Sequence, residues 1–176
     1  MNEELVVLLA ADGTRIGTAS KALVHTEDTP LHLAFSCYLY DGEGRILMTR
    51  RALGKKAWPG VWTNSFCGHP GEGESFESAM VRRAEQELGT TITSIDALLP
   101  DFAYRAVDAS GIVENEICPV FTASITGELN PNPDEVAQYA WIEPQELKTA
   151  ALAAPFAFSP WLLEQIAQGA LKTQRP

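Results

Sequence analysis

The sequence predicts an α/β (α+β) fold, a sandwich of helices around a mixed β-sheet. Strand-like segments outnumber helical ones, one strongly amphipathic helix lies in mid-chain, and two helices that begin with proline come late. The 176 residues are enough for one compact core. Because no repeat, low-complexity stretch or long linker divides the sequence, residues 1–176 are expected to form a single domain.

Short apolar runs bounded by turn residues indicate strands along most of the chain. Before the central helix, strands are expected at residues 5–10, 16–19, 31–40, 45–51 and 61–66. After it, extended segments are expected at residues 95–99, 102–107, 112–125 and 136–142. Alternation in segment 31–40 would place Phe35, Cys37 and Leu39 on one face, and His32 and Tyr38 on the other.

The central helix is expected over residues 75–88. Ser75 is a suitable N-cap and Gly89 a suitable residue to end the helix. An apolar stripe repeats at every fourth position, which predicts one buried face: Phe76, Met80, Ala84 and Leu88. Later helices are expected at residues 144–152 and from Pro160, where Ser159 would be the N-cap.

Composition and charge narrow the classes of partner. The chain carries 13 basic and 23 acidic residues, a net charge of −10, which argues against nucleic acid or an anionic membrane. A local basic pocket for a small anion remains compatible with that charge. Three cysteines cannot all pair with one another, and there is no signal peptide or apolar run of transmembrane length. We therefore expect a reduced, cytoplasmic protein.

A thiol and an imidazole, Cys67 and His69, follow the strand at 61–66 in a glycine-rich loop, which suggests a metal and phosphate site. The stretch resembles the Nudix box, whose matching residues are Gly68, Glu74, Arg82, Glu87 and Gly89. Arg83 and Gln86 stand where that motif has glutamates. A Nudix hydrolase uses those carboxylates to hold Mg²⁺, so the scaffold looks retained and the hydrolytic metal cluster reduced.

Several other side chains have both a chemical and a structural interpretation. Glu114 and Glu116 are two residues apart, about 7 Å along a strand, and either converge on a cation or form an exposed polar face. Cys67 is either a packing residue or a reactive thiol, whose pKa a nearby metal, histidine or arginine would lower. Cys37 and Cys118 are expected to pack in the core.

Cationic candidates for a phosphate pocket carry the alternative of ordinary surface charges: Lys21, Arg51, Lys55, Arg82 and Arg83. Each histidine, taken singly, is more often a surface or hydrogen-bonded residue than a ligand. Tyr104 and Trp161 are, by the same standard, more often structural than functional.

Five segments, taken together, favour the functional interpretations over the structural ones: LHLAFS at 31–36, TRRALGKKAWPGVWTNSFCGHP at 49–70, YRA at 104–106, GIVENEICPVF at 111–121 and FSPW at 158–161. Together they resemble type I isopentenyl-diphosphate delta-isomerases, a family with a modified, Nudix-like α/β/α sandwich, over nearly the whole chain. NSFCGHP is close to the family's TNSxCxHP motif, and ENE matches its paired glutamates. The resemblance implies an isomerase that interconverts isopentenyl diphosphate and dimethylallyl diphosphate for isoprenoid biosynthesis.

The resemblance also implies two metal sites. One divalent ion, Mn²⁺, Mg²⁺ or Zn²⁺, would be bound by five side chains: His25, His32, His69, Glu114 and Glu116. A second ion, Mg²⁺, would sit on the diphosphate and be held by Glu87 and the main-chain carbonyl of Cys67. The segment from Lys21 to His25 is the least regular part bearing proposed ligands, so we expect it to be mobile without metal.

The remaining implied roles concern the substrate. Cations would neutralise the diphosphate: Lys21, Arg51, Lys55 and Arg83. Cys67 and Glu116 would be the acid–base pair, with Tyr104 hydrogen-bonded near Glu116 and Trp161 facing the alkene.

Moving the double bond requires adding a proton at one carbon and removing one from another, through a tertiary carbocation that water must not reach. An aromatic face stabilises such a cation by about 2 kcal/mol. Acid and base on opposite faces of the alkene would be roughly 7–8 Å apart. For isopentenyl diphosphate we expect Glu116, with Tyr104, to donate and Cys67 to accept. Proton transfer of this kind needs no flavin.

Two alternatives would be distinguished by experiment. A Nudix hydrolase would release phosphate from nucleoside diphosphate derivatives and leave isopentenyl diphosphate unchanged. A non-catalytic Nudix-like binding module would keep its biological activity in the Cys67→Ala and Glu116→Gln variants. The protein is expected to be a monomer or a weak homodimer.

Overall fold

The computed structural model describes residues 4–171. Strands form two mixed sheets. The smaller sheet has five strands in the order β2-β1-β3-β10-β9. Its strands are β1 (Leu5–Leu9), β2 (Arg15–Ser20), β3 (His32–Leu33), β9 (Ala103–Val107) and β10 (Val113–Ile117). All neighbouring pairs are antiparallel except β3 and β10, which run parallel.

The larger sheet has seven strands, of which five follow the order β12-β5-β4-β11-β8. These five are β4 (Phe35–Tyr40), β5 (Ile46–Arg51), β8 (Ile92–Leu99), β11 (Val120–Ile125) and β12 (Val136–Ile142). Two short strands, β6 (Trp62–Thr63) and β7 (Phe66–Gly68), pair with β5 and β4. Strands β4 and β11 are parallel and the other pairs antiparallel, so this sheet is mixed as expected.

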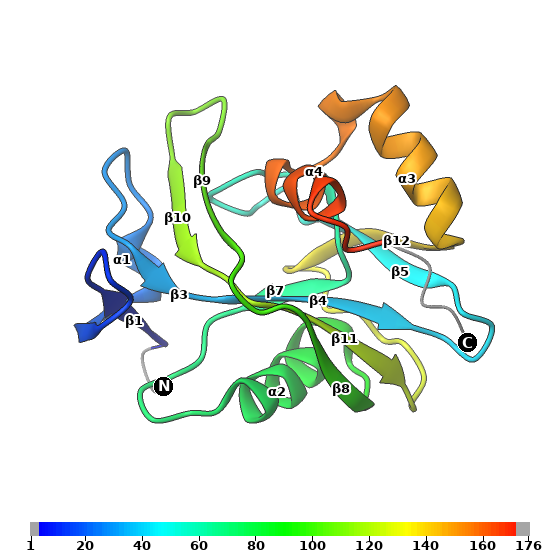
Figure 1. Cartoon of the computed structure of the whole chain (residues 1–176), viewed down its shortest axis with the longest axis horizontal. Coiled ribbons are helices and arrows are strands. Elements are labelled where there is room, and N and C mark those ends of the chain that lie inside the picture. The colour runs from blue at the N-terminus through cyan, green and yellow to red at the C-terminus, as the bar shows by residue number, and fades with distance from the viewer. Residues whose placement is uncertain (1–3, 172–176) are drawn as a thin grey trace.

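Helices cover both faces of the larger sheet, which confirms the expected sandwich. Helix α2 (Phe76–Leu88) lies on one face, and α3 (Pro144–Ala153) and α4 (Pro160–Ala167) lie on the other (Figure 1). The alternation predicted for β4 sets this up: Phe35, Cys37 and Leu39 pack in the core under α2, and Tyr38 packs in the core under α3 and α4. Cys37 and Cys118 are buried in these cores, as predicted.

Helix α2 forms where the sequence places it. The Ser75 side chain accepts a hydrogen bond from the Ser78 amide, and Gly89 ends the helix with a left-handed φ of 58°. A Cβ at Gly89 would lie 2.4 Å from the Asn130 carbonyl oxygen, so glycine is required there for two reasons. The helix exposes few of its apolar residues because Met80, Ala84 and Leu88 are fully buried.

Three predicted strands are each two strands in the structure. Segment 31–40 breaks at Ala34, and segment 112–125 breaks at Cys118 and Pro119. At its break each segment passes from the smaller sheet to the larger one. Pro119 has no amide hydrogen to donate to a ladder. Segment 61–66 breaks into β6 and β7, and β7 extends to Gly68, so Cys67 lies in a strand rather than in a loop.

Two short helical elements lie next to residues of the predicted site or connect its helices. Helix α1 (Lys21–Val24) ends just before His25, in a segment expected to be irregular. A 3₁₀ helix at Pro155–Ala157 turns the chain between α3 and α4. Within residues 4–171, no helix has both the length and the apolar composition to cross a membrane.

Candidate active site

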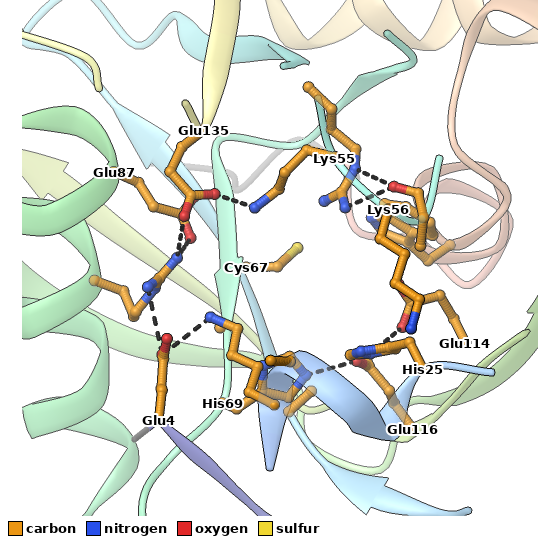
Figure 2. A pocket seen from close by; sticks show the side chains of 18 of the residues that line it. Glu4, His25, Lys55, Lys56, Cys67, His69, Glu87, Glu114, Glu116 and Glu135 are labelled. Carbon is orange, nitrogen blue, oxygen red and sulfur yellow. Dashed lines mark hydrogen bonds and ion pairs between the residues drawn. The ribbon is translucent and has the colours of Figure 1, made fainter. Parts of the chain in front are cut away.

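A cavity of about 520 Å³ opens between the two sheets and the start of α4. It is lined by twelve of the thirteen residues to which the family resemblance assigns a role: Lys21, His25, Arg51, Lys55, Cys67, His69, Arg83, Glu87, Tyr104, Glu114, Glu116 and Trp161. The thirteenth, His32, is fully buried beside it. The size lies within the range of small-molecule sites. Figure 2 shows the Cys67 thiol pointing into the middle of this cavity, with Glu87 and Glu135 on one side and His25 and Glu114 on the other.

Three histidines and two glutamates meet at one end of the cavity. The ring centroids of His32 and His69 lie 5.1 Å apart, and His25 lies 5.2 Å from His32. Glu116 Oε1 lies 3.0 Å from His69 Nε2 and 3.3 Å from His32 Nε2. Glu114 Oε2 lies 3.0 Å from His25 Nε2. The pair of glutamates converges because both project from one face of β10, as their spacing predicted.

The donor set of this cluster fits a divalent metal. One ligand atom from each of His25, His32, His69 and Glu116 lies within 4.8 Å of the others. His25 Nε2 and His32 Nε2 are buried without a hydrogen-bond partner among the described residues, and so is Glu114 Oε2, which lies 3.0 Å from His25 Nε2 but outside the set of four. Buried polar atoms without hydrogen bonds are what a metal would satisfy. The His32 Nδ1 atom is 2.9 Å from the Pro30 carbonyl oxygen, which would fix the ring as a ligand through Nε2.

The Cys67 thiol is held by neutral polar groups. Ser36 Oγ lies 3.3 Å from Sγ, and the Asn64 amide nitrogen donates to Sγ at 3.4 Å. Burial raises the pKa of Cys67 to about 12, although these hydrogen bonds oppose the shift. The negative charges of Glu116 and Glu87 act in the same direction as burial, so the thiol does not have the lowered pKa that was expected beside a histidine or arginine.

Glu116 has the opposite protonation. Burial alone would favour its neutral form, but the neighbouring imidazoles of His32 and His69 hold its pKa well below its usual range. Tyr104 stands directly across from Glu116 in the β9–β10 ladder, so the two side chains share a face. Burial and the nearby Glu116 charge raise the pKa of Tyr104 well above its usual value, so the phenol keeps its proton.

Aromatic rings form one wall of the cavity. Trp161 is the second residue of α4, after Pro160 and the Ser159 cap, and its ring centroid lies 5.6 Å from that of Tyr104 and 5.9 Å from that of Trp58. The Trp161 Nε1 atom donates to Asn64 Oδ1 at 3.1 Å, which fixes the ring plane. The Arg51 guanidinium carbon lies 5.8 Å from the centre of the Trp161 ring.

Cations line the rest of the cavity wall, and four of them have a partner. Lys21 Nζ lies 3.0 Å from Glu4 Oε1, Lys55 pairs with Glu135, and Arg83 pairs with Glu87. Arg51 instead donates from Nη2 to the Ala57 carbonyl oxygen at 2.9 Å. The pKa of Arg83 is raised because its carboxylate neighbours outweigh the effect of burial.

Arg82, the other cationic candidate from the sequence, has a structural contact. Its guanidinium donates to both oxygens of Glu74, at 2.8 and 2.7 Å, and to the His69 carbonyl oxygen at 3.1 Å. Glu74 also accepts from the Gly71 amide at 2.7 Å. Arg82 and Glu74, both in the Nudix box, therefore stabilise the loop between β7 and α2 and hold the main chain of His69 in position.

Sequence reasoning did not find several residues that contact the site. Asn64 touches both Cys67 and Trp161, and its amide also donates to the Cys37 and Phe66 carbonyl oxygens at 3.1 and 3.0 Å. Its place in the NSFCGHP motif was the available signal. Glu4 and Glu135, which pair with the cations, come from segments with no recognisable motif.

The comparisons with known proteins agree with this geometry. The NUDIX domain family matches residues 30–162. A protein of Leifsonia xyli subsp. xyli named isopentenyl-diphosphate Delta-isomerase is 64% identical over 168 residues, covering 93% of this chain and 89% of that protein. A protein of the same name from Citrobacter koseri is 54% identical, covering 94% of this chain and 91% of the relative.

This chain belongs to the isopentenyl-diphosphate Delta-isomerase family. The family membership confirms the resemblance drawn from the sequence motifs. Solved structures with little sequence identity share the fold. One from Deinococcus radiodurans has a TM-score of 0.71 at 20% identity and covers 94% of this chain and 98% of its own. The MutT protein from Methanosarcina mazei has a TM-score of 0.62 at 13% identity, with 83% and 97% covered. These likenesses show that the chain has the Nudix fold.

Proposed function

We propose that this protein is an enzyme that interconverts isopentenyl diphosphate and dimethylallyl diphosphate, supplying precursors for isoprenoid biosynthesis. One observation carries the proposal: a single cavity holds Cys67 and Glu116 together, between an aromatic wall and a group of cations. Relatives that are 54–64% identical bear the name of this activity. The domain is proposed to act as a single unit over residues 1–176.

The cationic end of the cavity suits a diphosphate. Lys21, Arg51, Lys55 and Arg83 come from four different segments and face the same space. Guanidinium and ammonium groups bind phosphoryl oxygens through short charge-assisted hydrogen bonds. Glu87 and the main-chain carbonyl of Cys67 are proposed to hold Mg²⁺ beside that diphosphate. Arg83 then serves as a phosphate ligand at a position where the Nudix motif has a glutamate.

The middle of the cavity suits the five-carbon chain. Trp161 and Tyr104 present rings to it, and an aromatic face stabilises a desolvated cation by about 2 kcal/mol. Trp161 is only 2% exposed, and this apolar wall is proposed to help keep water from the tertiary cation. No electrons are gained or lost when the double bond moves, so the proposal includes no flavin or other redox cofactor.

Cys67 and Glu116 are proposed to exchange the proton with the substrate. As expected from the sequence, Glu116 with Tyr104 is proposed to donate the proton when isopentenyl diphosphate is consumed, and Cys67 to accept one. Because the reaction is reversible, the two roles exchange in the reverse direction. Tyr104, beside Glu116, would hydrogen-bond to the carboxylate when it is charged.

The histidine–glutamate cluster is proposed to hold Mn²⁺, Mg²⁺ or Zn²⁺ through His25, His32, His69, Glu114 and Glu116. When bound, the ion would supply a fixed positive charge that keeps Glu116 ionised and oriented. The free state of all three cysteines fits a reducing compartment, and we propose the cytoplasm. A monomer or weak homodimer remains our prediction for the assembly.

The test is incubation of isopentenyl diphosphate with the protein and Mg²⁺ in D₂O, followed by NMR. The expected result is dimethylallyl diphosphate that carries deuterium. Cys67→Ala and Glu116→Gln should each slow the reaction by about 10²–10⁴-fold, the usual contribution of an acid or base. Cys37→Ala, which removes a buried thiol outside the cavity, should retain the activity. An unchanged substrate spectrum, or phosphate release without isomerisation, would reject the proposal.

A further inference from the structure

Three carboxylates pair with the cations of the cavity. Glu4, Glu87 and Glu135 contact Lys21, Arg83 and Lys55 respectively, and all six residues line the cavity. Glu135 contacts two of the proposed diphosphate-binding cations: it pairs with Lys55 through Oε2, and its Oε1 lies 3.5 Å from Arg83 Nη2. Figure 2 shows Glu135 beside Glu87, with its carboxylate facing Lys55 across the cavity.

The main chain holds Glu135 in this place. Its amide donates to the Asn132 carbonyl oxygen at 3.0 Å, and its carbonyl oxygen accepts from the Ala52 amide at 2.9 Å. The next residue, Val136, opens β12 opposite Arg51, another proposed diphosphate ligand. The carboxylate therefore stands at a fixed point between Lys55 and Arg83 rather than at the end of a free loop.

Glu135 and Glu87 share one guanidinium nitrogen, since Arg83 Nη2 contacts Oε1 of both. A metal-free diphosphate that reached Lys55 and Arg83 would have to displace both carboxylates from them. It would then lie within a few Å of two negative charges, and like charges that close repel strongly in a partly desolvated site. A diphosphate that arrives with a divalent cation removes this conflict, because the cation attracts the displaced carboxylates.

We propose that Glu135 is a positioning residue that makes diphosphate binding depend on a divalent cation. The inference rests on the proposed function, because it assumes that the diphosphate occupies the cationic end of the cavity. Glu135 holds Lys55 and Arg83 in place before substrate arrives and competes with any diphosphate that lacks its metal. The pocket thereby selects the metal complex of the substrate over the bare anion.

A purely structural role for Glu135 makes a different prediction. Its side chain and that of Lys55 are 20% and 23% exposed, so the pair is largely buried and helps to place the Lys55 ammonium group. If the pair served only to place Lys55, its loss would weaken diphosphate binding equally with and without metal. Competition between Glu135 and a bare diphosphate, in contrast, weakens binding mainly when metal is absent. The ratio of the affinities with and without metal therefore separates the two roles.

The experiment is calorimetric titration of inorganic pyrophosphate into the full-length protein, with and without added Mg²⁺. Wild type should bind much more tightly with Mg²⁺. In the isosteric Glu135→Gln variant, affinity without Mg²⁺ should rise by about tenfold, and the ratio of the two affinities should fall by at least that factor. Glu135→Asp, which keeps the charge, should preserve a ratio close to that of wild type. Glu128→Gln is the matched control, because Glu128 is exposed and outside the cavity.

The outcomes separate this inference from the proposed function. An unchanged ratio in Glu135→Gln, or an equal loss of affinity in both conditions, would overturn the role of Glu135 and leave the diphosphate site intact. Failure of the wild-type protein to bind pyrophosphate under either condition would overturn the diphosphate site itself, and the inference with it. Circular dichroism of each variant establishes that the fold survives, and Glu135→Asp tests the charge if the glutamine variant does not fold.

Discussion

Adding one methyl group at Gly68 should damage both the stability and the activity of the protein. Gly68 separates Cys67 from His69 and pairs with Phe35 across the β4–β7 ladder. A Cβ at this position would lie 2.7 Å from Arg83 Cγ and 2.9 Å from Phe35 Cζ. Relaxed carbon contacts are about 3.5–4.0 Å, so the neighbours would have to move by roughly 0.5–1 Å.

Neither neighbour has free space. Phe35 is fully buried and Arg83 is 4% exposed, with its guanidinium held by Glu87. The strain should therefore fall partly on β7, at a cost of about 1–3 kcal/mol, the usual range for overpacking. A shift of β7 moves the thiol and the imidazole together, and a displacement of about 1 Å at a catalytic group costs on the order of 10²-fold in rate.

Urea unfolding and the NMR isomerisation assay measure the two effects of Gly68→Ala. Gly42→Ala is the control, since a Cβ there meets nothing within 4 Å and the residue lies in a surface turn. The control should match wild type in both assays. If Gly68→Ala unfolds at the wild-type urea concentration and isomerises at the wild-type rate, the close packing of β7 against α2 does not hold the site as argued.

Further predictions concern the buried polar groups of the site. Asn64→Ala should lower the free energy of unfolding by about 2–4 kcal/mol, since it leaves several buried partners unpaired, including Trp161 Nε1; urea unfolding with no loss would refute this. Chelation should lower the melting temperature of wild type, but not that of His32→Ala, in differential scanning calorimetry. In the metal-free protein, Glu116 adds stability above pH 4.5, its ordinary pKa, and that stability is lost as pH falls through its lower folded pKa. Wild type should therefore lose more stability than Glu116→Gln on acidification. Alkylation of Cys67 by iodoacetamide should be slow at neutral pH and accelerate without a plateau as pH rises toward its pKa of about 12; a plateau near neutrality would contradict the buried thiol.

Local patterns predicted α2 and the capped start of α4, because a repeat of apolar residues and a cap act within a few turns. They did not predict where strands change sheets. Residues 32–39 are all buried, on both sides of the break at Ala34, so the pattern of side chains gives no sign of a new sheet. Pro119 was the one local signal for the second break, and it lies inside a run that otherwise reads as a strand.

The site shows the same division. Motifs located Cys67, the histidines and the paired glutamates, because their residue types and spacing are specific to one chemistry. Glu135 lies 80 residues from Lys55 in the chain, and Glu4 lies 79 from Arg83. Such pairs depend on the tertiary fold alone. The pKa of Cys67 depends likewise on how deeply the thiol is buried, which no neighbouring residue in the sequence reveals.

A crystal structure of the Cys67→Ala variant with isopentenyl diphosphate and Mg²⁺ would test the central claim most directly. The account predicts that the five-carbon chain lies between residue 67 and the Glu116 carboxylate, against Trp161, with the diphosphate on Lys55 and Arg83. A chain bound outside that gap, or with residue 67 and Glu116 on the same face of the alkene, would contradict it.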